Sequence, residues 1–194
     1  MPSSFMLDTN AYFLLFEGAK ALSYSNLIEK IRVGKMKFFY ISEITSMEIH
    51  SVLGKYRRET PHQPQRCDRK IVSGSNIETC SNTWITQKRK PMKLSLFLHI
   101  QKLIADAEAR RGDIQATILK LDNNSIEKAR NLLISYADRY NFGSHDALIA
   151  GSFITAKESG MNLTLITSDR GLKAVLKEES MSLYDPLTPQ SLTF

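Results

Sequence analysis

A short apolar run at residues 5–7 ends abruptly in three polar residues, Asp8, Thr9 and Asn10. Apolar runs of this length, bounded by polar residues, are typical of central strands in a parallel sheet. In open α/β sheets, ligands bind outside the carboxyl ends of the strands, so the position of Asp8 predicts a functional site there. All three polar residues are also good N-caps for the helix predicted over residues 11–16. Capping is the favoured interpretation for this stretch taken alone.

The composition predicts one α/β domain. The chain has 194 residues, of which 42% are hydrophobic and 24% charged, which is enough for a compact domain with its own core. No apolar run reaches the roughly 20 residues of a membrane span, and the first residues lack the pattern of a signal peptide. We therefore expect a cytoplasmic protein with no membrane partner. Cys67 and Cys80 are too few for a disulfide framework or a four-ligand zinc site. Two free thiols are favoured, and a single disulfide or a redox role stays open.

A second acid follows a second predicted strand, which spans residues 37–41. The helical spacing that comes next includes Thr45-x-x-Glu48, the pattern of a capping box. This pattern predicts that Thr45 caps the helix and that Glu48 occupies its third position. A helix that starts just after a strand also projects its first-turn carboxylate over the sheet edge where Asp8 lies. Capping and metal binding therefore compete for the Glu48 side chain.

Two more acids lie at similar positions later in the chain. Ser144 is the predicted N-cap of a helix, which puts Asp146 in the first turn, where a carboxylate also gains from the helix dipole. On a helix, the side chain of His145 points in a different direction from that of Asp146. We therefore expect His145 to lie beside the site rather than to act as a base. A strand predicted over residues 163–167 then delivers Asp169, which repeats the arrangement at the first strand.

Residues 54–93 interrupt the α/β pattern with prolines, few aliphatic side chains, and ten lysines and arginines against three acids, a net charge of +7. The whole chain carries +6, so we predict a basic insertion or long loop within a single domain spanning residues 1–194. A charge run usually forms a solvated surface. The nearby Tyr56 and the only tryptophan instead favour phosphate contacts with base stacking. The two interpretations stand level, and the candidate RNA contacts are Arg57, Arg58, Lys88, Arg89 and Trp84.

Four acids share one type of position in the predicted sheet: Asp8, Glu48, Asp146 and Asp169. Each falls at the carboxyl end of a strand or in the first turn of a helix, and in a parallel sheet these positions meet at one edge. Crowded carboxylates repel and raise one another's pKa unless a cation compensates, so the pattern predicts a bound divalent ion. Hard oxygen ligands select Mg²⁺ or Mn²⁺ over zinc.

Four short pieces carry these acids in order along nearly the whole chain: Leu7-Asp8-Thr9-Asn10, Ile44-Thr45-Ser46-Met47-Glu48-Ile49, Asp146-Ala147-Leu148-Ile149-Ala150 and Leu165-Ile166-Thr167-Ser168-Asp169. Together they resemble the PIN-domain family of ribonucleases and, within it, the VapC-like toxins of bacterial toxin–antitoxin pairs. The resemblance implies an α/β fold with a central parallel sheet flanked by helices on both faces. It also implies that the four acids bind metal and carry catalysis, with Asn10 and Thr167 orienting them. The basic segment at residues 54–93 is longer than expected in a compact toxin.

The implied chemistry is hydrolysis of RNA phosphodiester bonds assisted by Mg²⁺ or Mn²⁺. No side-chain nucleophile is needed, which agrees with the lack of a G-x-S-x-G motif, a Cys/His signature or a glycine-rich phosphate loop. The resemblance further implies products with a 5′-phosphate and a 3′-hydroxyl. The expected partners are an RNA substrate, an antitoxin protein, and a second copy of the chain in a homodimer.

Two other functions stay open. A haloacid-dehalogenase-like phosphatase would use Asp8 as a covalent nucleophile. A resemblance to that family would require a second Asp two residues later, where this chain has Asn10, and an Asp-Asp pair where it has Ser168-Asp169. A catalytically silent PIN-fold module that binds RNA or protein would keep the fold, and the presence of all four acids argues against it.

Overall fold

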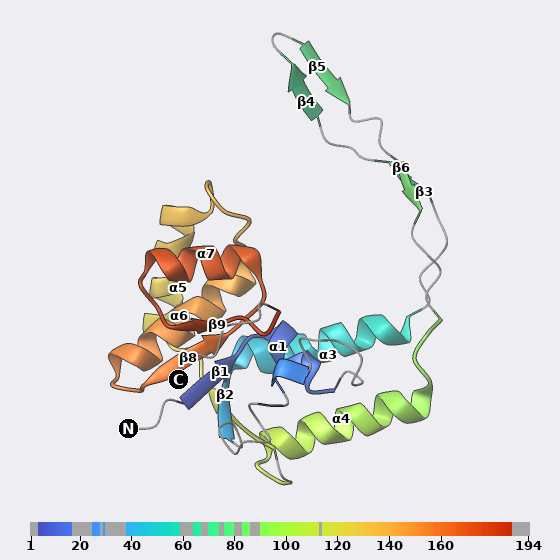
Figure 1. The fold of residues 1–194 in the computed structure, drawn as a ribbon, viewed down its shortest axis with the longest axis vertical. Helices are drawn as coiled ribbons and strands as arrows, with labels where there is room; N and C mark the ends of the chain where they lie inside the picture. Colours follow the sequence, from blue (N-terminus) through green and yellow to red (C-terminus); the bar gives the residue numbers. More distant parts are fainter. Residues whose placement is uncertain are drawn as a thin grey trace. The chain divides into compact units, whose positions relative to one another are not determined.

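A computed structural model describes residues 4–16, 25–27, 29, 38–58, 64–66, 70–73, 76–79, 83–85, 90–112 and 114–187 (Figure 1). The chain divides into two compact units. One comprises residues 1–51 and 100–194, and the other comprises residues 52–99. No helix in the described part of the chain has the length and apolar character needed to cross a bilayer.

Five parallel strands form the central sheet of the larger unit, in the order β7-β2-β1-β8-β9. Strand β1 therefore lies in the middle, and its Met6 is in register with Tyr40 on one side and Leu165 on the other. This arrangement confirms the predicted α/β fold with a central parallel sheet. The strands are β1 (Ser4–Leu7), β2 (Phe38–Ser42), β7 (Gln115–Leu119), β8 (Leu163–Ile166) and β9 (Leu183–Tyr184).

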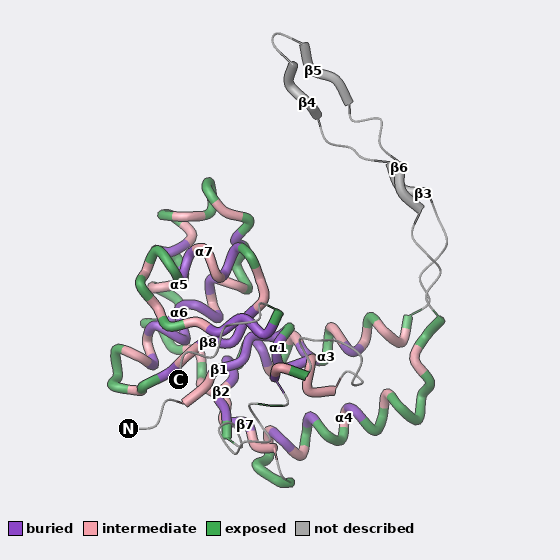
Figure 2. The backbone as a smooth tube through the Cα atoms, in the orientation of Figure 1, coloured by how far each residue is buried: buried purple, intermediate pink, exposed green. Residues whose placement is uncertain are grey.

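Helices pack against both faces of this sheet, because successive strand side chains point to opposite sides. On one face Met6 and Leu165 join a buried cluster with helices α5 (Asn123–Tyr136), α6 (Ser144–Glu158) and α7 (Arg170–Glu178). On the other face the Phe39 ring meets the Tyr12 ring of α1 (Thr9–Leu14) edge to face, with centroids 5.7 Å apart. Figure 2 shows the buried strands between these layers.

Helix α3 (Glu43–Arg57) begins directly where strand β2 ends. The Ser42 hydroxyl accepts a hydrogen bond from the backbone N–H of Thr45 and donates one to the Thr45 hydroxyl, each at 3.0 Å. The prediction that Thr45 caps this helix is therefore wrong, because Ser42, the last residue of β2, supplies the capping hydroxyl and the helix begins at Glu43. Glu48 consequently lies in the second turn and has no capping role.

The smaller unit contains the basic segment. Residues 54–57 continue α3, and two short antiparallel pairs follow: β3 (Pro64–Arg66) with β6 (Thr83–Ile85), and β4 (Lys70–Ser73) with β5 (Asn76–Thr79). The segment predicted as an insertion or long loop thus has strands of its own. Its two ends are joined, because Met92 N donates to Tyr56 O at 2.7 Å and Arg57 Nη1 donates to Met92 O at 2.6 Å.

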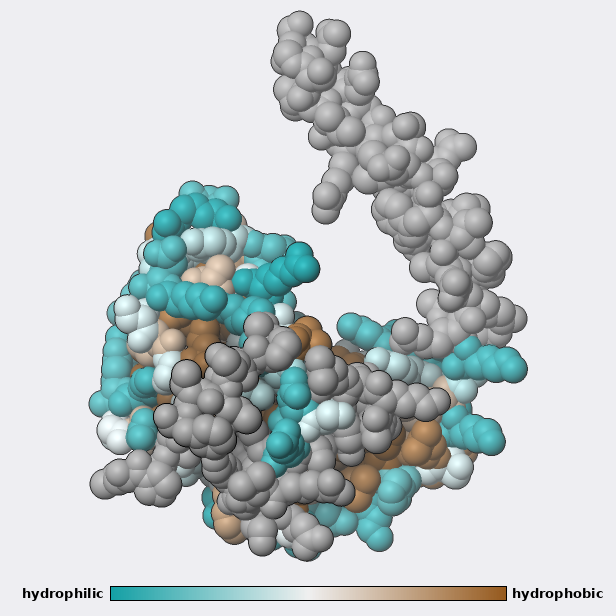
Figure 3. Space-filling view, viewed as in Figure 1, coloured by the Kyte–Doolittle hydropathy of each residue, from teal (hydrophilic) through white to brown (hydrophobic). Residues whose placement is uncertain are grey.

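Helix α4 (Leu94–Glu108) buries only its second half, where Ile100, Ile104 and Ala107 face the core. Figure 3 shows hydrophobic side chains on the surface of this helix. The exposed leucines of α4 are Leu94, Leu96, Leu98 and Leu103, with 41% to 55% of each residue accessible.

Gly151 allows α6 to lie against α5. A Cβ at this position would lie 2.2 Å from the Ser125 carbonyl oxygen and 3.0 Å from the Ala129 nitrogen. Because these are backbone atoms, we expect Gly151→Ala to lower the free energy of unfolding by about 1–3 kcal/mol in urea titrations. Gly54→Ala is the control, since its Cβ would meet no described atom within 4 Å and should stabilise α3 by about 1 kcal/mol. Equal losses in both variants would contradict the close approach of the two helices.

Candidate active site

Asp8 is buried at the carboxyl end of the central strand, with 3% of the residue exposed. Its Oδ1 accepts a hydrogen bond from Ala11 N at 2.6 Å and thereby caps α1. Its Oδ2 accepts a hydrogen bond from the Thr167 hydroxyl at 2.5 Å. The capping interpretation of this stretch is confirmed, and the same carboxylate also joins the end of β1 to the end of β8.

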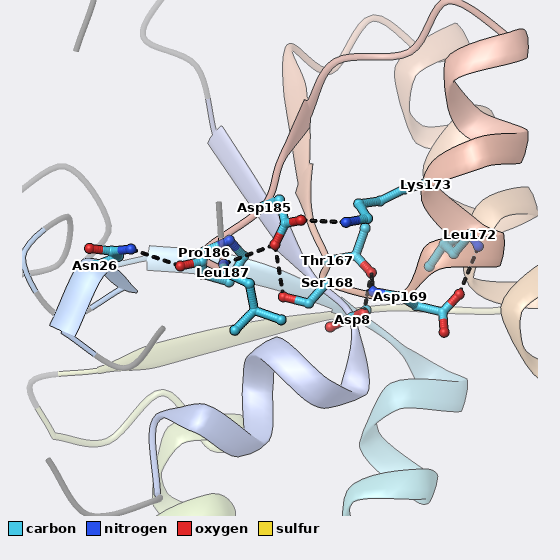
Figure 4. Close-up of polar contacts among 10 residues, drawn as sticks. All are labelled: Asp8, Asn26, Thr167, Ser168, Asp169, Leu172, Lys173, Asp185, Pro186 and Leu187. Carbon is cyan, nitrogen blue, oxygen red and sulfur yellow. Dashed lines mark hydrogen bonds and ion pairs between the residues drawn. The ribbon is translucent and has the colours of Figure 1, made fainter. Parts of the chain in front are cut away.

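The turn after β8 contributes two residues to the site (Figure 4). The Thr167 hydroxyl donates to Asp8 and accepts a hydrogen bond from Asp169 N at 3.0 Å. Asp169 is the N-cap of α7, and its Oδ1 accepts from Leu172 N at 2.8 Å. Thr167 therefore holds both the carboxylate of Asp8 and the backbone of Asp169, which is an orienting position.

Asp146 and Glu48 come from the two helices that start beside the same sheet edge. Asp146 lies in the first turn of α6, and its Oδ2 accepts from Gly143 N at 3.2 Å. The predicted Ser144 cap is wrong, because the helix begins one residue earlier with Gly143 at the capping position. Glu48 Oε2 accepts a hydrogen bond from the Thr9 hydroxyl at 2.5 Å, and Glu48 Oε1 lies 3.7 Å from His145 Nδ1.

Electrostatic interactions link the four acids into one cluster. Burial raises the pKa of Asp8 to about 7; hydrogen bonds from Thr167 and Ala11 oppose this shift, and the charges of Asp169 and Asp146 add to it. Burial also raises the pKa of Asp146. The Gly143 N–H and the charge of His145 oppose that shift, whereas the charges of Asp169 and Glu48 add to it. The structure thus brings the four predicted acids together.

The donor chemistry of this cluster fits a hard divalent ion. Three acids each keep one carboxylate oxygen that accepts no hydrogen bond from a described residue: Glu48 Oε1, Asp146 Oδ1 and Asp169 Oδ2. Such oxygens are the ligands that Mg²⁺ and Mn²⁺ prefer, and a cation would offset the burial of the carboxylates and their mutual repulsion, which together raise the pKa of Asp8 and Asp146. In their present rotamers no three His, Cys, Asp or Glu side chains among the described residues converge on one point. Binding would therefore include rotation of some carboxylates.

Two residues that contact the site were not predicted from the sequence, and one predicted helper makes no hydrogen bond to the acids. Thr9 is buried and holds Glu48, whereas Asn10 is exposed and makes no hydrogen bond to any described residue. Asp185, just after β9, accepts a hydrogen bond from Ser168 in the turn beside the site. The adjacency of Thr9 to Asp8 was the available signal for Thr9. No sequence pattern pointed to Asp185, because the strand that it follows, β9, is only two residues long.

The predicted RNA contacts are placed only in part. Arg57 is half-buried, donates to Met92 O, and lies over the Phe97 ring at 6.0 Å from its centroid, so its guanidinium has structural contacts. Arg58 is exposed. Trp84 lies in β6, and Lys88 and Arg89 fall outside the described residues.

The chain shares its fold with three solved structures. FitAcB from Neisseria gonorrhoeae aligns with a TM-score of 0.54 at 15% identity, over 94% of this chain and 97% of that one. DNA-bound VapBC from Salmonella typhimurium gives 0.52 at 15% identity, over 95% and 98%. A toxin–antitoxin complex from Klebsiella pneumoniae gives 0.50 at 16% identity, over 94% and 98%. No protein-family model and no curated protein matches the sequence. At these identities the likeness defines the fold of the chain.

The raised pKa of Asp8 predicts how stability depends on pH. The folded state binds the Asp8 proton up to about pH 7, whereas the unfolded chain releases it near the ordinary aspartate pKa of 3.8. Between these values the folded state holds more protons, so the metal-free protein should lose stability as pH rises, by up to about 1.4 kcal/mol per pH unit from this group. Urea titrations from pH 4 to 7 measure the slope, and Asp8→Asn should reduce it. Identical slopes for the parent and the variant would exclude this assignment.

Proposed function

We propose that this chain is an endoribonuclease that depends on Mg²⁺ or Mn²⁺ and acts as the toxin of a toxin–antitoxin pair. The observation that supports this most strongly is the gathering of four acids at the carboxyl edge of a parallel sheet, on a fold shared with toxin–antitoxin complexes. Acids such as Asp8 and Asp146, whose pKa is raised by burial and further by neighbouring acids, are characteristic of functional sites.

In this proposal Asp8, Glu48, Asp146 and Asp169 hold the ion. When bound, the ion supplies Lewis-acid polarisation of the phosphodiester and activation of water. Thr167 fixes the Asp8 carboxylate, and its contact with Asp169 N keeps the second strand end in place. The burial of Asp8 limits the access of solvent to the floor of the site.

Glu48 and its neighbours form the side of the proposed site. The Thr9 hydroxyl donates a hydrogen bond to Glu48 Oε2, which leaves Glu48 Oε1 for the ion. Glu48 does not cap α3, so its position in the helix sets the direction of its side chain. His145, which is largely exposed, stands beside Glu48 and is placed to meet an incoming anionic substrate. The products expected from this chemistry carry a 5′-phosphate and a 3′-hydroxyl.

Asp146→Asn is the direct test of the proposed activity. The variant keeps an oxygen that can accept from Gly143 N, so we expect it to fold, with a thermal melt close to that of the parent. RNA cleavage in Mg²⁺ or Mn²⁺ should fall by about 100-fold or more, because even outer partners of metal ligands typically contribute about 10- to 100-fold. Glu158→Gln is the matched control on the same helix, where the acid pairs with Lys128 away from the site, and its activity should be unchanged. Undiminished cleavage by Asp146→Asn, or cleavage by the parent in EDTA, would refute the proposal.

The basic segment is proposed to bind the RNA backbone. The segment contains positively charged side chains, among them the exposed Arg58, Lys90 and Lys93. The acidic cluster has no positive charge of its own to pair with RNA phosphates. Replacing Arg58, Lys88 and Arg89 by Ala should weaken RNA binding and flatten its log–log salt dependence by about 2, since each phosphate contact on a single strand contributes about 0.7. Fluorescence anisotropy at several salt concentrations measures both. Arg57→Ala is the control, because Arg57 contacts Met92 O and should affect stability more than salt dependence. An unchanged slope in the triple variant would indicate a solvated surface instead.

A protein partner is also proposed. The similar structures include a toxin–antitoxin complex, and α4 exposes four leucines that a protein partner could cover. A small reading frame directly upstream would encode the candidate antitoxin, and a second copy of the chain is the other expected partner. Co-expression with the upstream product should suppress RNA cleavage by the purified complex.

The two alternative functions have less support. The phosphatase would need a second Asp two residues after Asp8, where this chain has the exposed Asn10, and an Asp-Asp pair where it has Ser168-Asp169. A silent binding module has no need for a buried carboxylate whose pKa is raised by its burial and further by neighbouring acids. The same cleavage assay separates the second alternative from the ribonuclease.

A further inference from the structure

The turn after β8 has two sides. Thr167 and Asp169 contribute to the acidic cluster, whereas the residue between them contacts a different partner: Ser168 Oγ donates a hydrogen bond to Asp185 Oδ1 at 3.0 Å. Figure 4 shows Asp8 and Asp185 contacting this turn through different residues. A contact made by Ser168 therefore acts on the backbone that carries both neighbouring site residues.

Asp185 is a buried carboxylate with three described donors. The residue is 9% exposed, and its Oδ2 forms an ion pair with Lys173 Nζ. Its Oδ1 accepts from Leu187 N at 2.9 Å in addition to Ser168 Oγ. Burying a carboxylate is costly unless charge and hydrogen bonds compensate, so a buried acid with this set of donors is held firmly in place.

Lys173 connects the same carboxylate to the helix that Asp169 caps. Lys173 lies in the first turns of α7, and its backbone N–H donates to Asp169 O at 3.1 Å. Asp185 therefore contacts both the turn, through Ser168, and the helix that follows it, through Lys173. The two contacts lie on either side of Asp169 in the sequence.

The segment that carries Asp185 is itself fixed. Thr167 N donates to Tyr184 O at 3.0 Å, which extends the pairing of β8 with β9 to the residue before Asp185. On the other side, Asn26 Nδ2 donates to Pro186 O at 2.8 Å. Asp185 thus has anchored backbone on both sides and can act as a support for the turn.

We propose that Asp185 is a positioning residue of the acidic site. Through its contacts with Ser168 and Lys173, Asp185 holds the turn at residues 167–169 in place. Thr167 and Asp169 are thereby kept in position at Asp8. The consequence for metal binding depends on the proposed ribonuclease function, whereas the consequence for the turn itself does not. Outer partners that orient metal-binding carboxylates typically change metal affinity by about 10- to 100-fold.

The test removes the link and leaves the ion pair. Ser168→Ala deletes the hydroxyl that reaches Asp185 but keeps Lys173 and Asp185 together. Ser182→Ala is the matched control: Ser182 Oγ donates to Leu163 O at 2.9 Å and accepts from Lys157 Nζ at the opposite end of β8, far along the strand from the acids. Asp185→Asn is a second variant, which keeps an oxygen acceptor for Ser168 and removes the charge that pairs with Lys173.

Three measurements are made on the full chain. Amide hydrogen exchange by NMR, in metal-free protein, follows the Asp169 N–H that donates to Thr167 Oγ1. Calorimetry follows the binding of Mn²⁺, and thermal melts follow overall stability. We expect Ser168→Ala to speed exchange at Asp169 by up to about tenfold and to weaken Mn²⁺ binding by about tenfold. Ser182→Ala should leave both unchanged, with a melting temperature similar to that of Ser168→Ala.

Two outcomes separate this inference from the proposed function. If exchange at Asp169 and Mn²⁺ affinity are the same in Ser168→Ala, Ser182→Ala and the parent, Asp185 is only a structural ion pair and the inference is wrong. If the parent neither binds Mn²⁺ nor cleaves RNA, the proposed function fails. Exchange at Asp169 in the metal-free chain then still decides whether Asp185 holds the turn.

Discussion

The hydrogen bond from the Thr167 hydroxyl to Asp8 joins the ends of two adjacent parallel strands, and the geometry of the acidic edge depends on it. A carboxylate as buried as Asp8 is stable only where donors replace water, and the two donors come from Thr167 and from the first turn of α1. The same hydroxyl accepts from Asp169 N. One threonine therefore sets the separation of two acids that repel each other, using groups that the parallel pairing of β1 and β8 has already brought together.

Most of the acids combine a local structural contact with their place in the cluster. Asp8 caps α1, Asp169 caps α7, and Asp146 accepts from the backbone at the start of α6. Each carboxylate thereby satisfies an N–H that a helix terminus would otherwise leave unpaired, and the helix dipole favours its negative charge. Glu48 differs, because Ser42 caps α3 and leaves the Glu48 carboxylate to Thr9. This double use of side chains explains how a chain of modest size gathers four acids at one edge without losing its fold.

The sequence was sufficient for strands β1, β2 and β8 and for the approximate position of each acid, and insufficient for the short strands β3–β6 and β9 and for side-chain partners. Apolar runs ending in acids identify β1 and β8 because strand periodicity is local, and parallel pairing then places their ends together. Helix starts were misjudged by one residue at Ser144 and by three at Thr45, since several neighbouring residues are competent caps and only tertiary packing selects one. The contacts of Thr9 and Asp185 join residues 39 and 17 positions apart, a separation at which sequence patterns carry no signal.

The hydrogen bonds that join the two ends of the basic segment affect how the chain can be altered. Tyr56 and Met92 are tied through backbone atoms, and Arg57 adds a second bond to Met92 O across 35 positions of sequence. Once the ends of a loop are pinned, the entropy of closing it grows only slowly with length, by about 0.6 kcal/mol for each doubling. The stretch between the pinned ends can therefore be shortened, lengthened or exchanged for another sequence at little thermodynamic cost to the smaller unit. The sequence between the two joined ends can therefore vary while the residues of the parallel sheet stay as they are.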